Sequence, residues 1–220
     1  MTRHYTVKSL ALAFFITLGI CAQVGKAKAT DLETITVAGG CFWCLESDSE
    51  RVDGVTEAVS GFIGGTVANP TYKQVVKGDT GHYEAVQITF DPEVVDLGQL
   101  YSMFFRSIDP TDAGGQFCDR GDAYRTAIFT SDLAQANAAK QAKAEAQEAL
   151  GTPIVTPILT ASAFYPAEAY HQDYYKGTQL VLTRFGPKRQ SSAYNAYRKA
   201  CGRDARVQEL WGDAAPFVGG

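Results

Sequence analysis

Residues 35–44 read Ile-Thr-Val-Ala-Gly-Gly-Cys-Phe-Trp-Cys, and this stretch decides how the chain around it folds. The first five residues predict a strand, and the glycine pair Gly39-Gly40 permits a sharp exit from it. If a helix begins near Phe42, the backbone N–H groups of its first turn point toward the sulfur of Cys41. Because these groups favour a thiolate, the sequence predicts a lowered pKa for Cys41 and a nucleophile at the junction.

Strand-like and helical segments alternate along the rest of the chain, which indicates one α+β domain. Strands are expected at residues 34–38, 55–63, 85–90, 126–130 and 154–160. Helices are expected at residues 42–52, 97–108 and 133–150. The last of these helices has cap candidates at Ser131-Asp132 and ends at Gly151. Residues 109–123 and the tail after Arg189 show no regular pattern, so we expect long irregular segments there.

The first 29 residues are expected to form a secretory signal peptide. Basic residues come first, an apolar stretch spans residues 10–20, and Ala27-Lys28-Ala29 is a small-x-small cleavage pattern before Thr30. An uncleaved membrane anchor is the alternative, and a lipid anchor through Cys21 is weakened by the bulky Ile20 before it. The signal predicts an exported protein, which would be periplasmic if the source is a Gram-negative bacterium. Residues 30–220 would then form its one functional domain. No stable membrane insertion is expected after cleavage.

Charge argues against a nucleic-acid partner. Without the four basic residues of the signal, 16 Lys and Arg face 24 Asp and Glu, which is a net charge of −8. A protein that binds phosphate backbones normally carries a basic patch instead.

Four cysteines remain after removal of the signal, namely Cys41, Cys44, Cys118 and Cys201. In an oxidising compartment this even number is compatible with two structural disulfides. Zinc binding by three of them with His82 or His171 is a second alternative, although a single CxxC without a second pair is a weak metal signal. No metal site is therefore predicted.

Four further sequence blocks follow the Gly40-Cys41-Phe42-Trp43 motif in order. They are Tyr72-Lys73-Gln74-Val75-Val76-Lys77-Gly78, Gly81-His82-Tyr83-Glu84-Ala85-Val86, Asp119-Arg120-Gly121-Asp122-Ala123-Tyr124-Arg125-Thr126-Ala127-Ile128 and Ala167-Glu168-Ala169-Tyr170-His171-Gln172-Asp173-Tyr174. Together the five blocks resemble the A-type peptide methionine sulfoxide reductases. The resemblance implies a single α+β domain, in which a central mixed sheet with a ferredoxin-like core is flanked by helices in two layers and followed by a long irregular C-terminal tail. It also implies reduction of the S epimer of methionine sulfoxide, a peptide-methionine (S)-S-oxide reductase activity.

Chemistry explains why this reaction needs a thiol and an acid. The Cys41 thiolate would attack the sulfoxide sulfur and become a sulfenic acid while methionine departs. The sulfoxide oxygen must acquire a proton, and Glu84 would supply it as general acid from a desolvated pocket that raises its pKa.

Five further residues complete the predicted site. The hydroxyl groups of Tyr72 and Tyr124 would donate to the sulfoxide oxygen, and Asp119 would orient them or fix the substrate. The rings of Phe42 and Trp43 would form an apolar wall for the S-methyl group.

A second thiol must resolve the sulfenic acid at Cys41. Cys201 resembles the resolving cysteine that the family carries in a mobile C-terminal segment. Cys44, through its CxxC spacing, and Cys118, beside Asp119, are the alternatives. The second tail cysteine of some relatives is absent, so no further internal exchange through that residue is expected.

Two other functions compete with this prediction. An exported thioredoxin-like thiol:disulfide oxidoreductase would use Cys41 and Cys44 alone and would give Glu84 no role. A binding module held by structural disulfides would show no thiol reactivity. The favoured function needs no bound cofactor, but it needs an external thioredoxin-like reductant. Its substrates would be oxidised exported proteins or free methionine sulfoxide. We expect the chain to act as a monomer.

Overall fold

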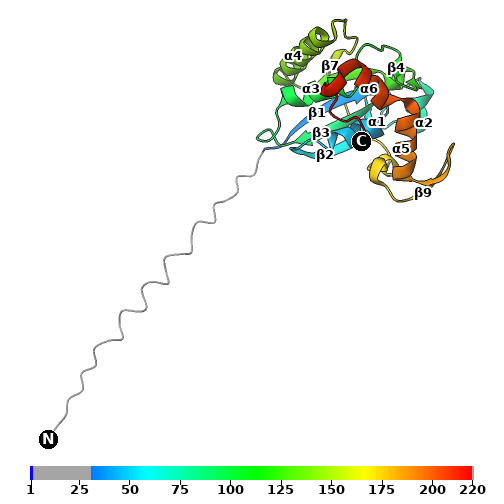
Figure 1. Cartoon of the computed structure of the whole chain (residues 1–220), viewed down its shortest axis with the longest axis horizontal. Helices are drawn as coiled ribbons and strands as arrows, with labels where there is room; N and C mark the ends of the chain where they lie inside the picture. The colour runs from blue at the N-terminus through cyan, green and yellow to red at the C-terminus, as the bar shows by residue number, and fades with distance from the viewer. Residues whose placement is uncertain (2–30, 220) are drawn as a thin grey trace.

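The computed structural model describes residue 1 and residues 31–219, so the predicted signal peptide at residues 1–29 lies almost entirely outside the described residues. Within them the main sheet has six strands in the order β7-β6-β1-β3-β2-β8 (Figure 1). These strands are β1 (Glu33–Gly39), β2 (Val55–Ile63), β3 (Tyr83–Phe90), β6 (Thr126–Thr130), β7 (Ile158–Thr160) and β8 (Tyr165–Pro166). Neighbouring strands run antiparallel except for the parallel pair β6 and β7, so the sheet is mixed, as predicted. Its inner four strands, β6-β1-β3-β2, have the predicted ferredoxin-like order.

Two small hairpins complete the strands. They are β4 (Gly115–Gln116) with β5 (Asp119–Arg120), and β9 (Leu180–Thr183) with β10 (Gly186–Arg189).

Helices cover one face of the sheet. They are α1 (Phe42–Ser49), α2 (Tyr72–Lys77), α3 (Leu97–Arg106), α4 (Leu133–Leu150), α5 (Gln190–Cys201) and α6 (Arg203–Trp211), with short 3₁₀ turns η1 (Asp122–Tyr124), η2 (Ala169–His171), η3 (Tyr174–Lys176) and η4 (Gly212–Ala214). In Figure 1, α4 lies at one end of the molecule and α5 with β9 at the other. No described helix is long and apolar enough to span a membrane.

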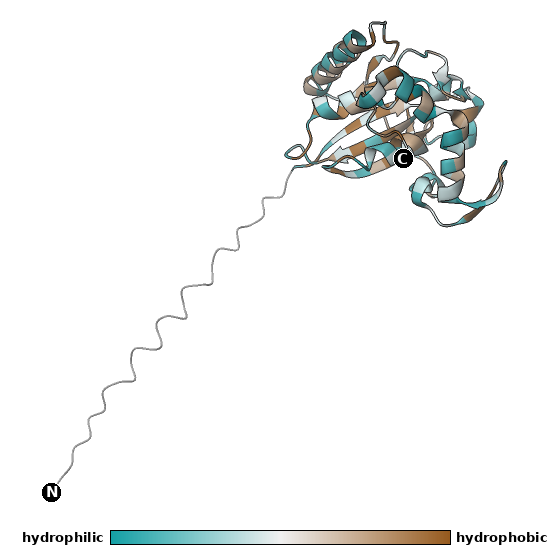
Figure 2. Cartoon of the chain, viewed as in Figure 1, coloured by the Kyte–Doolittle hydropathy of each residue, from teal (hydrophilic) through white to brown (hydrophobic). Residues whose placement is uncertain are grey.

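The main core lies between the helices and the sheet. The predicted helix α3 is amphipathic, since Leu100, Tyr101, Phe104 and Phe105 are buried in this core together with β-strand residues. A smaller cluster around Phe129 fills the opposite face of the sheet. Figure 2 shows hydrophobic residues gathered where helices meet strands, and hydrophilic residues along the outside of α4. The arrangement is the predicted two-layer α+β domain.

The strand order places three segments at one end of the sheet. Val37 of β1 pairs with Val86 of β3, so the end of β1 and the start of β3 lie side by side. Gly39 of β1 pairs with Thr126, the first residue of β6. The residues that follow β1, open β3 and precede β6 therefore meet, although they are far apart in the sequence.

The predicted irregular tail is wrong, because residues 190–211 form α5 and α6. Gly202, with φ of 72°, separates the two helices. The helical pattern is hard to recognise because the buried face of each helix carries an arginine, Arg198 in α5 and Arg203 in α6. Residues 109–123 are irregular as expected, apart from the β4-β5 hairpin.

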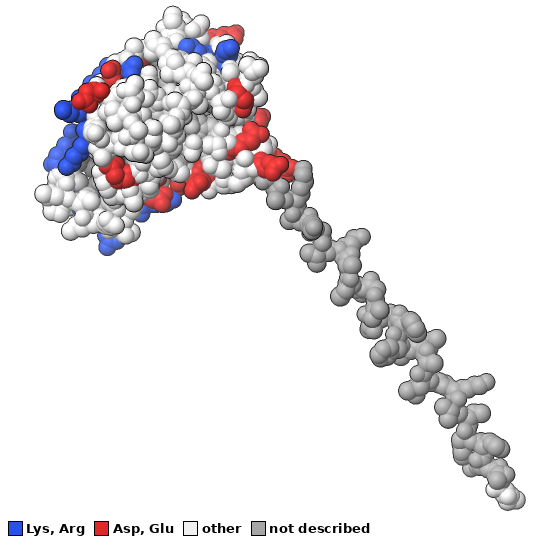
Figure 3. All heavy atoms as spheres, turned by 180° about the vertical axis from the view of Figure 1, so that it is seen from behind, with Lys and Arg blue, Asp and Glu red and all other residues white. Residues whose placement is uncertain are grey.

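Charge is unevenly distributed over the surface. In Figure 3, Lys and Arg gather along one edge of the molecule, which corresponds to the side of α2 and α5 in Figure 1, while Asp and Glu are spread over the rest of this view.

Candidate active site

Cys41 lies at the junction of β1 and α1, as predicted. It is the N-cap residue of α1 and is 6% exposed. Gly40 has φ of 80°, and a Cβ atom there would lie 2.5 Å from the Cβ atom of Gln116. Only glycine fits this turn, which carries the chain from the strand directly into the helix.

Glu84 lies directly beside this turn. Its Oε2 accepts a hydrogen bond from the backbone N–H of Phe42 at 3.1 Å, and the side chain is 1% exposed. Its other oxygen, Oε1, is buried and has no hydrogen-bond partner among the described residues. Burial raises the pKa of Glu84 well above its ordinary value, and nearby Asp119 raises it further, whereas the bond from Phe42 opposes the shift. The surroundings of Glu84 thus favour the protonated carboxyl group, and its Oε1 has no partner among the described residues.

One cavity of about 80 Å³ brings the predicted residues together. It is lined by Cys41, Phe42, Trp43, Tyr72, Glu84, Asp119 and Tyr124, all predicted from the sequence, and by Tyr197, which was not. Tyr197 was missed because the tail was not recognised as a helix. In α5 it lies one turn before Cys201, a spacing that would have found it.

Aromatic rings form the walls of the cavity. Phe42 stacks on Tyr72 with ring centroids 6.0 Å apart, and Trp43 stacks on Tyr174 at 3.9 Å. Tyr197 meets Trp43 edge-on at 6.3 Å. The site is therefore apolar around the few groups that can donate or accept protons.

Tyr72 and Tyr124 come from different elements and line the same cavity. Tyr72 opens α2, and Tyr124 ends η1 just before β6. Burial raises the pKa of both hydroxyl groups, and the charge of Glu84 adds to the shift. Both side chains therefore remain neutral donors at physiological pH.

Asp119 binds the tail to the cavity. Its carboxylate accepts a hydrogen bond from the hydroxyl group of Tyr197. Burial raises the pKa of Asp119, while the bond from Tyr197 and the charge of Arg203 counteract this shift.

Cys41 and Cys44 are both free and buried, and a hydrogen bond links their sulfur atoms. The predicted lowered pKa of Cys41 is wrong. Burial raises its pKa well above the ordinary value, and the neighbouring Cys44, Glu84 and Asp119 add to the increase. The pKa of Cys44 is lowered instead, by the hydrogen bond from Cys41 and by the charges of Arg203 and Arg198. The N–H group of Phe42, expected to favour a Cys41 thiolate, binds Glu84.

Cys201 forms a disulfide with Cys118, with Cα atoms 4.9 Å apart. The sequence had named both only as possible partners of Cys41. The alternative of two structural disulfides is wrong, because Cys41 and Cys44 are free thiols. The structure also separates the residues considered for zinc. Among the described residues, the groups of close ligand atoms are Cys118-Asp119-Cys201 and Glu46-Glu50-Asp173, and neither includes Cys41, Cys44 or a histidine.

The two histidines considered for zinc, His82 and His171, differ in their surroundings, because both ring nitrogens of His171 are buried without a hydrogen-bond partner among the described residues. The Nε2 atom of His82 lies 2.8 Å from the carbonyl oxygen of Val67. His171 is packed against Phe42 and Tyr72, and its burial lowers its pKa to about 4. Neither lines the cavity.

Comparison with known proteins agrees with the geometry. A family model described as peptide methionine sulfoxide reductase matches residues 33–212. The peptide methionine sulfoxide reductase MsrA 2 of Rhizobium meliloti is 47% identical over 206 residues, which cover 94% of this chain and 96% of the relative. The protein of the same name from Caulobacter vibrioides is 43% identical, with 94% and 100% covered.

Solved structures show the same fold. Methionine sulfoxide reductase A of Corynebacterium diphtheriae superposes with a TM-score of 0.62 at 33% identity, covering 68% of this chain and 76% of that chain. Mxr1 from Saccharomyces cerevisiae in reduced form gives a TM-score of 0.63 at 33% identity, covering 66% and 84%. On this evidence the chain belongs to the peptide methionine sulfoxide reductase family, and it is an oxidoreductase that reduces methionine sulfoxide with its thiols.

Proposed function

We propose that Cys41 is the nucleophile and Glu84 the general acid in the reduction of methionine S-sulfoxide. One observation carries the proposal: the buried carboxyl group of Glu84, with Oε1 unpartnered among the described residues, lines the same cavity as the Cys41 thiol. A protonated carboxyl group beside a thiol is what a neutral S=O group needs in order to lose its oxygen.

The step conserves atoms and protons. The sulfur of Cys41 attacks the sulfoxide, the S=O bond breaks, and the oxygen is transferred to Cys41 as a sulfenic acid while methionine leaves. Glu84 gives its proton to the oxygen and takes up the proton of the Cys41 thiol. The raised pKa of both groups supports this exchange, because each holds a proton before the substrate arrives.

The rest of the cavity holds the substrate. Tyr72 and Tyr124 donate hydrogen bonds to the sulfoxide oxygen as its charge grows. Asp119 fixes the substrate, and Phe42 and Trp43 pack on the S-methyl group. A cavity of about 80 Å³ supports recognition of the methyl sulfoxide head alone, which suits both free and protein-bound methionine sulfoxide.

Cys201 then resolves the sulfenic acid. Its thiol forms a disulfide with Cys41, and water is released. Tyr197, one turn earlier in α5, lines the cavity, which supports this choice. Cys44 is the alternative because its sulfur is hydrogen-bonded to that of Cys41.

Turnover requires an external dithiol, for which we propose a thioredoxin-like protein. The basic, apolar and small-x-small pattern of residues 1–29 supports export, and hence a periplasmic location in a Gram-negative source with oxidised exported proteins as substrates. We propose that the exported chain acts as a monomer.

Activity of Glu84 variants tests the proposal. With dithiothreitol and free methionine S-sulfoxide, we expect Glu84→Gln to lower kcat/KM by about 10²- to 10⁴-fold. Glu57→Gln, at an exposed position of the neighbouring strand β2, is the matched control and should retain the wild-type value. A Glu84→Gln variant within threefold of the wild type would contradict the role of Glu84. The R epimer should not be reduced by any of these proteins.

A further inference from the structure

The Cys118–Cys201 disulfide is far more accessible than the free thiols. Cys118 lies at the tip of the β4-β5 hairpin and is exposed, and Cys201 ends α5 and is half-buried. Cys41 and Cys44 are 6% and 2% exposed. A reductant protein can therefore reach the hairpin tip, whereas Cys41 and Cys44 are covered.

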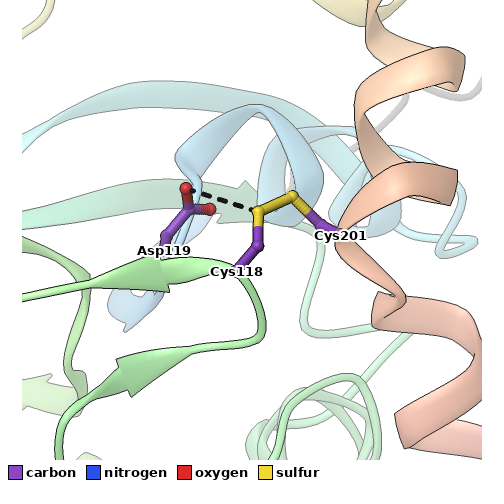
Figure 4. Close-up of side chains that lie close together, drawn as sticks. All are labelled: Cys118, Asp119 and Cys201. Atoms are coloured by element: carbon purple, nitrogen blue, oxygen red, sulfur yellow. Dashed lines mark hydrogen bonds between the residues drawn. A yellow bond between two sulfur atoms is a disulfide. The ribbon is translucent and has the colours of Figure 1, made fainter.

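The disulfide also borders the active-site cavity. A carboxylate oxygen of Asp119 lies within 4.8 Å of both sulfur atoms (Figure 4). The same side chain lines the cavity, as Cys41 does. Tyr197 reaches Asp119 from α5, one turn before Cys201. Asp119 therefore links the disulfide to the active-site cavity.

The hairpin holds Cys118 in place. Phe117, the residue before it, has φ of 54°, a conformation that a bulky residue rarely adopts. Its ring is held against the guanidinium group of Arg203, 4.8 Å from the ring centroid. Strain of this kind persists when the surrounding structure fixes it, and it often marks a functional turn.

We propose that Cys118 is a second resolving cysteine and that Cys118–Cys201 is the disulfide presented to the external dithiol. The proposal rests on the proposed function. After Cys201 has joined Cys41, the Cys118 thiolate attacks the sulfur of Cys201. The Cys118–Cys201 bond forms, the Cys41–Cys201 bond breaks, and Cys41 takes the proton that Cys118 gave up. No electrons are gained or lost by the protein in this exchange.

The external dithiol completes the cycle. Its two thiols become a disulfide, and Cys118 and Cys201 each recover a proton. The direction of the internal exchange is favoured because burial raises the pKa of Cys41, so the released thiol keeps its proton and the reverse attack is slow. Cys41 is then free to reduce another substrate before the external dithiol arrives.

Counting methionine released without reductant tests the relay. The full chain carrying Cys21→Ser and Cys44→Ser keeps Cys41, Cys118 and Cys201. It is reduced with dithiothreitol, desalted and mixed with excess methionine S-sulfoxide. We expect two methionines per chain, one from the Cys118–Cys201 disulfide and one from the final Cys41 sulfenic acid. Adding Cys118→Ser should reduce the yield twofold, to one, whereas Lys140→Ala on the exposed face of α4 should leave it at two.

Each other outcome has a defined meaning. One methionine with or without Cys118 would overturn the relay and leave the proposed function intact. Methionine release that persists after Cys41→Ser would overturn the proposed function itself. If the combined variants do not fold, disulfide mapping of the reduced wild-type chain after one equivalent of substrate decides. Cys118–Cys201 newly formed supports the relay, and Cys41–Cys44 or Cys41–Cys201 as the final bond overturns it.

Discussion

At the scale of a residue, burial and one backbone hydrogen bond define the surroundings of Glu84. The Phe42 N–H group holds one oxygen, and the other has no partner among the described residues. The sequence placed Glu84 in the site through its resemblance to a known block, but it assigned the Phe42 N–H group to Cys41. The Phe42 N–H group could bind either the sulfur of Cys41 or the carboxyl group of Glu84. The position of β3 beside α1 decides between them, and the sequence alone does not give this tertiary arrangement.

The raised pKa of Glu84 predicts a pH-dependent stability. A carboxyl group whose pKa is higher in the folded than in the unfolded chain stabilises the fold at low pH, and the contribution is lost as pH rises from the ordinary glutamate value through the raised one. Glu84→Gln removes this loss. Its free energy of unfolding should therefore increase relative to the wild type as pH rises, by up to about 1.4 kcal/mol per pH unit.

Urea unfolding of both proteins at a series of pH values measures this difference. Glu57→Gln, at an exposed position, should give a difference from the wild type that does not change with pH. A pH-independent difference for Glu84→Gln as well would mean that the pKa of Glu84 is not raised.

At the scale of elements, α5 and α6 are held against α1 by buried charges. Asp48 lies in α1 and is 2% exposed. Its Oδ1 lies 2.8 Å from Nη1 of Arg198 in α5, and its Oδ2 lies 3.8 Å from Nε of Arg203 in α6. Arg203 also donates to the carbonyl oxygens of Gly39 and Ser107. These contacts fix α6 and also α5, which carries both Tyr197 and Cys201.

We expect Asp48→Ala to lower the free energy of unfolding by about 3–5 kcal/mol, because it removes a buried carboxylate from two buried arginines. Arg198 would keep the carboxylate of Asp204 at 2.8 Å, whereas Arg203 would keep only its carbonyl hydrogen-bond partners among the described residues. Asp53→Ala, at an exposed position four residues beyond the end of α1, should change the free energy of unfolding by less than about 0.5 kcal/mol. Urea unfolding measures the free energy of unfolding of both variants. It is done under reducing conditions, because these remove the contribution of the Cys118–Cys201 disulfide. Equal stabilities for the two variants would show that the charge cluster does not anchor the helices.

Element prediction succeeded where apolar periodicity is plain and failed where buried charge replaces it. The helix at Leu133–Leu150 and the strands at Val55–Ile63 and Thr126–Thr130 agree residue for residue with the expectation. By contrast, α5 and α6 were expected to be irregular, because Arg198 and Arg203 interrupt their apolar faces. A buried arginine can be recognised only once its partner, Asp48, is known to lie opposite.

At the scale of the whole molecule, the sheet order determines which residues meet. The end of β1, the start of β3 and the start of β6 lie together, and this brings Cys41, Glu84 and Tyr124 into one cavity. The sequence predicted the members of this cavity except Tyr197, and it did not predict the Cys118–Cys201 pairing. The packing of α5 against the β4-β5 hairpin decides both.

The most direct test of the account is a chain whose only cysteine is Cys41. In the full chain carrying Cys21→Ser, Cys44→Ser, Cys118→Ser and Cys201→Ser, no disulfide can form and no thiol can resolve the nucleophile. After reduction and desalting, we expect one methionine per chain from methionine S-sulfoxide, together with a sulfenic acid at Cys41 that dimedone traps and peptide mass spectrometry locates. Absence of methionine and of the dimedone adduct in this folded variant would contradict the claim that Cys41 alone removes the oxygen.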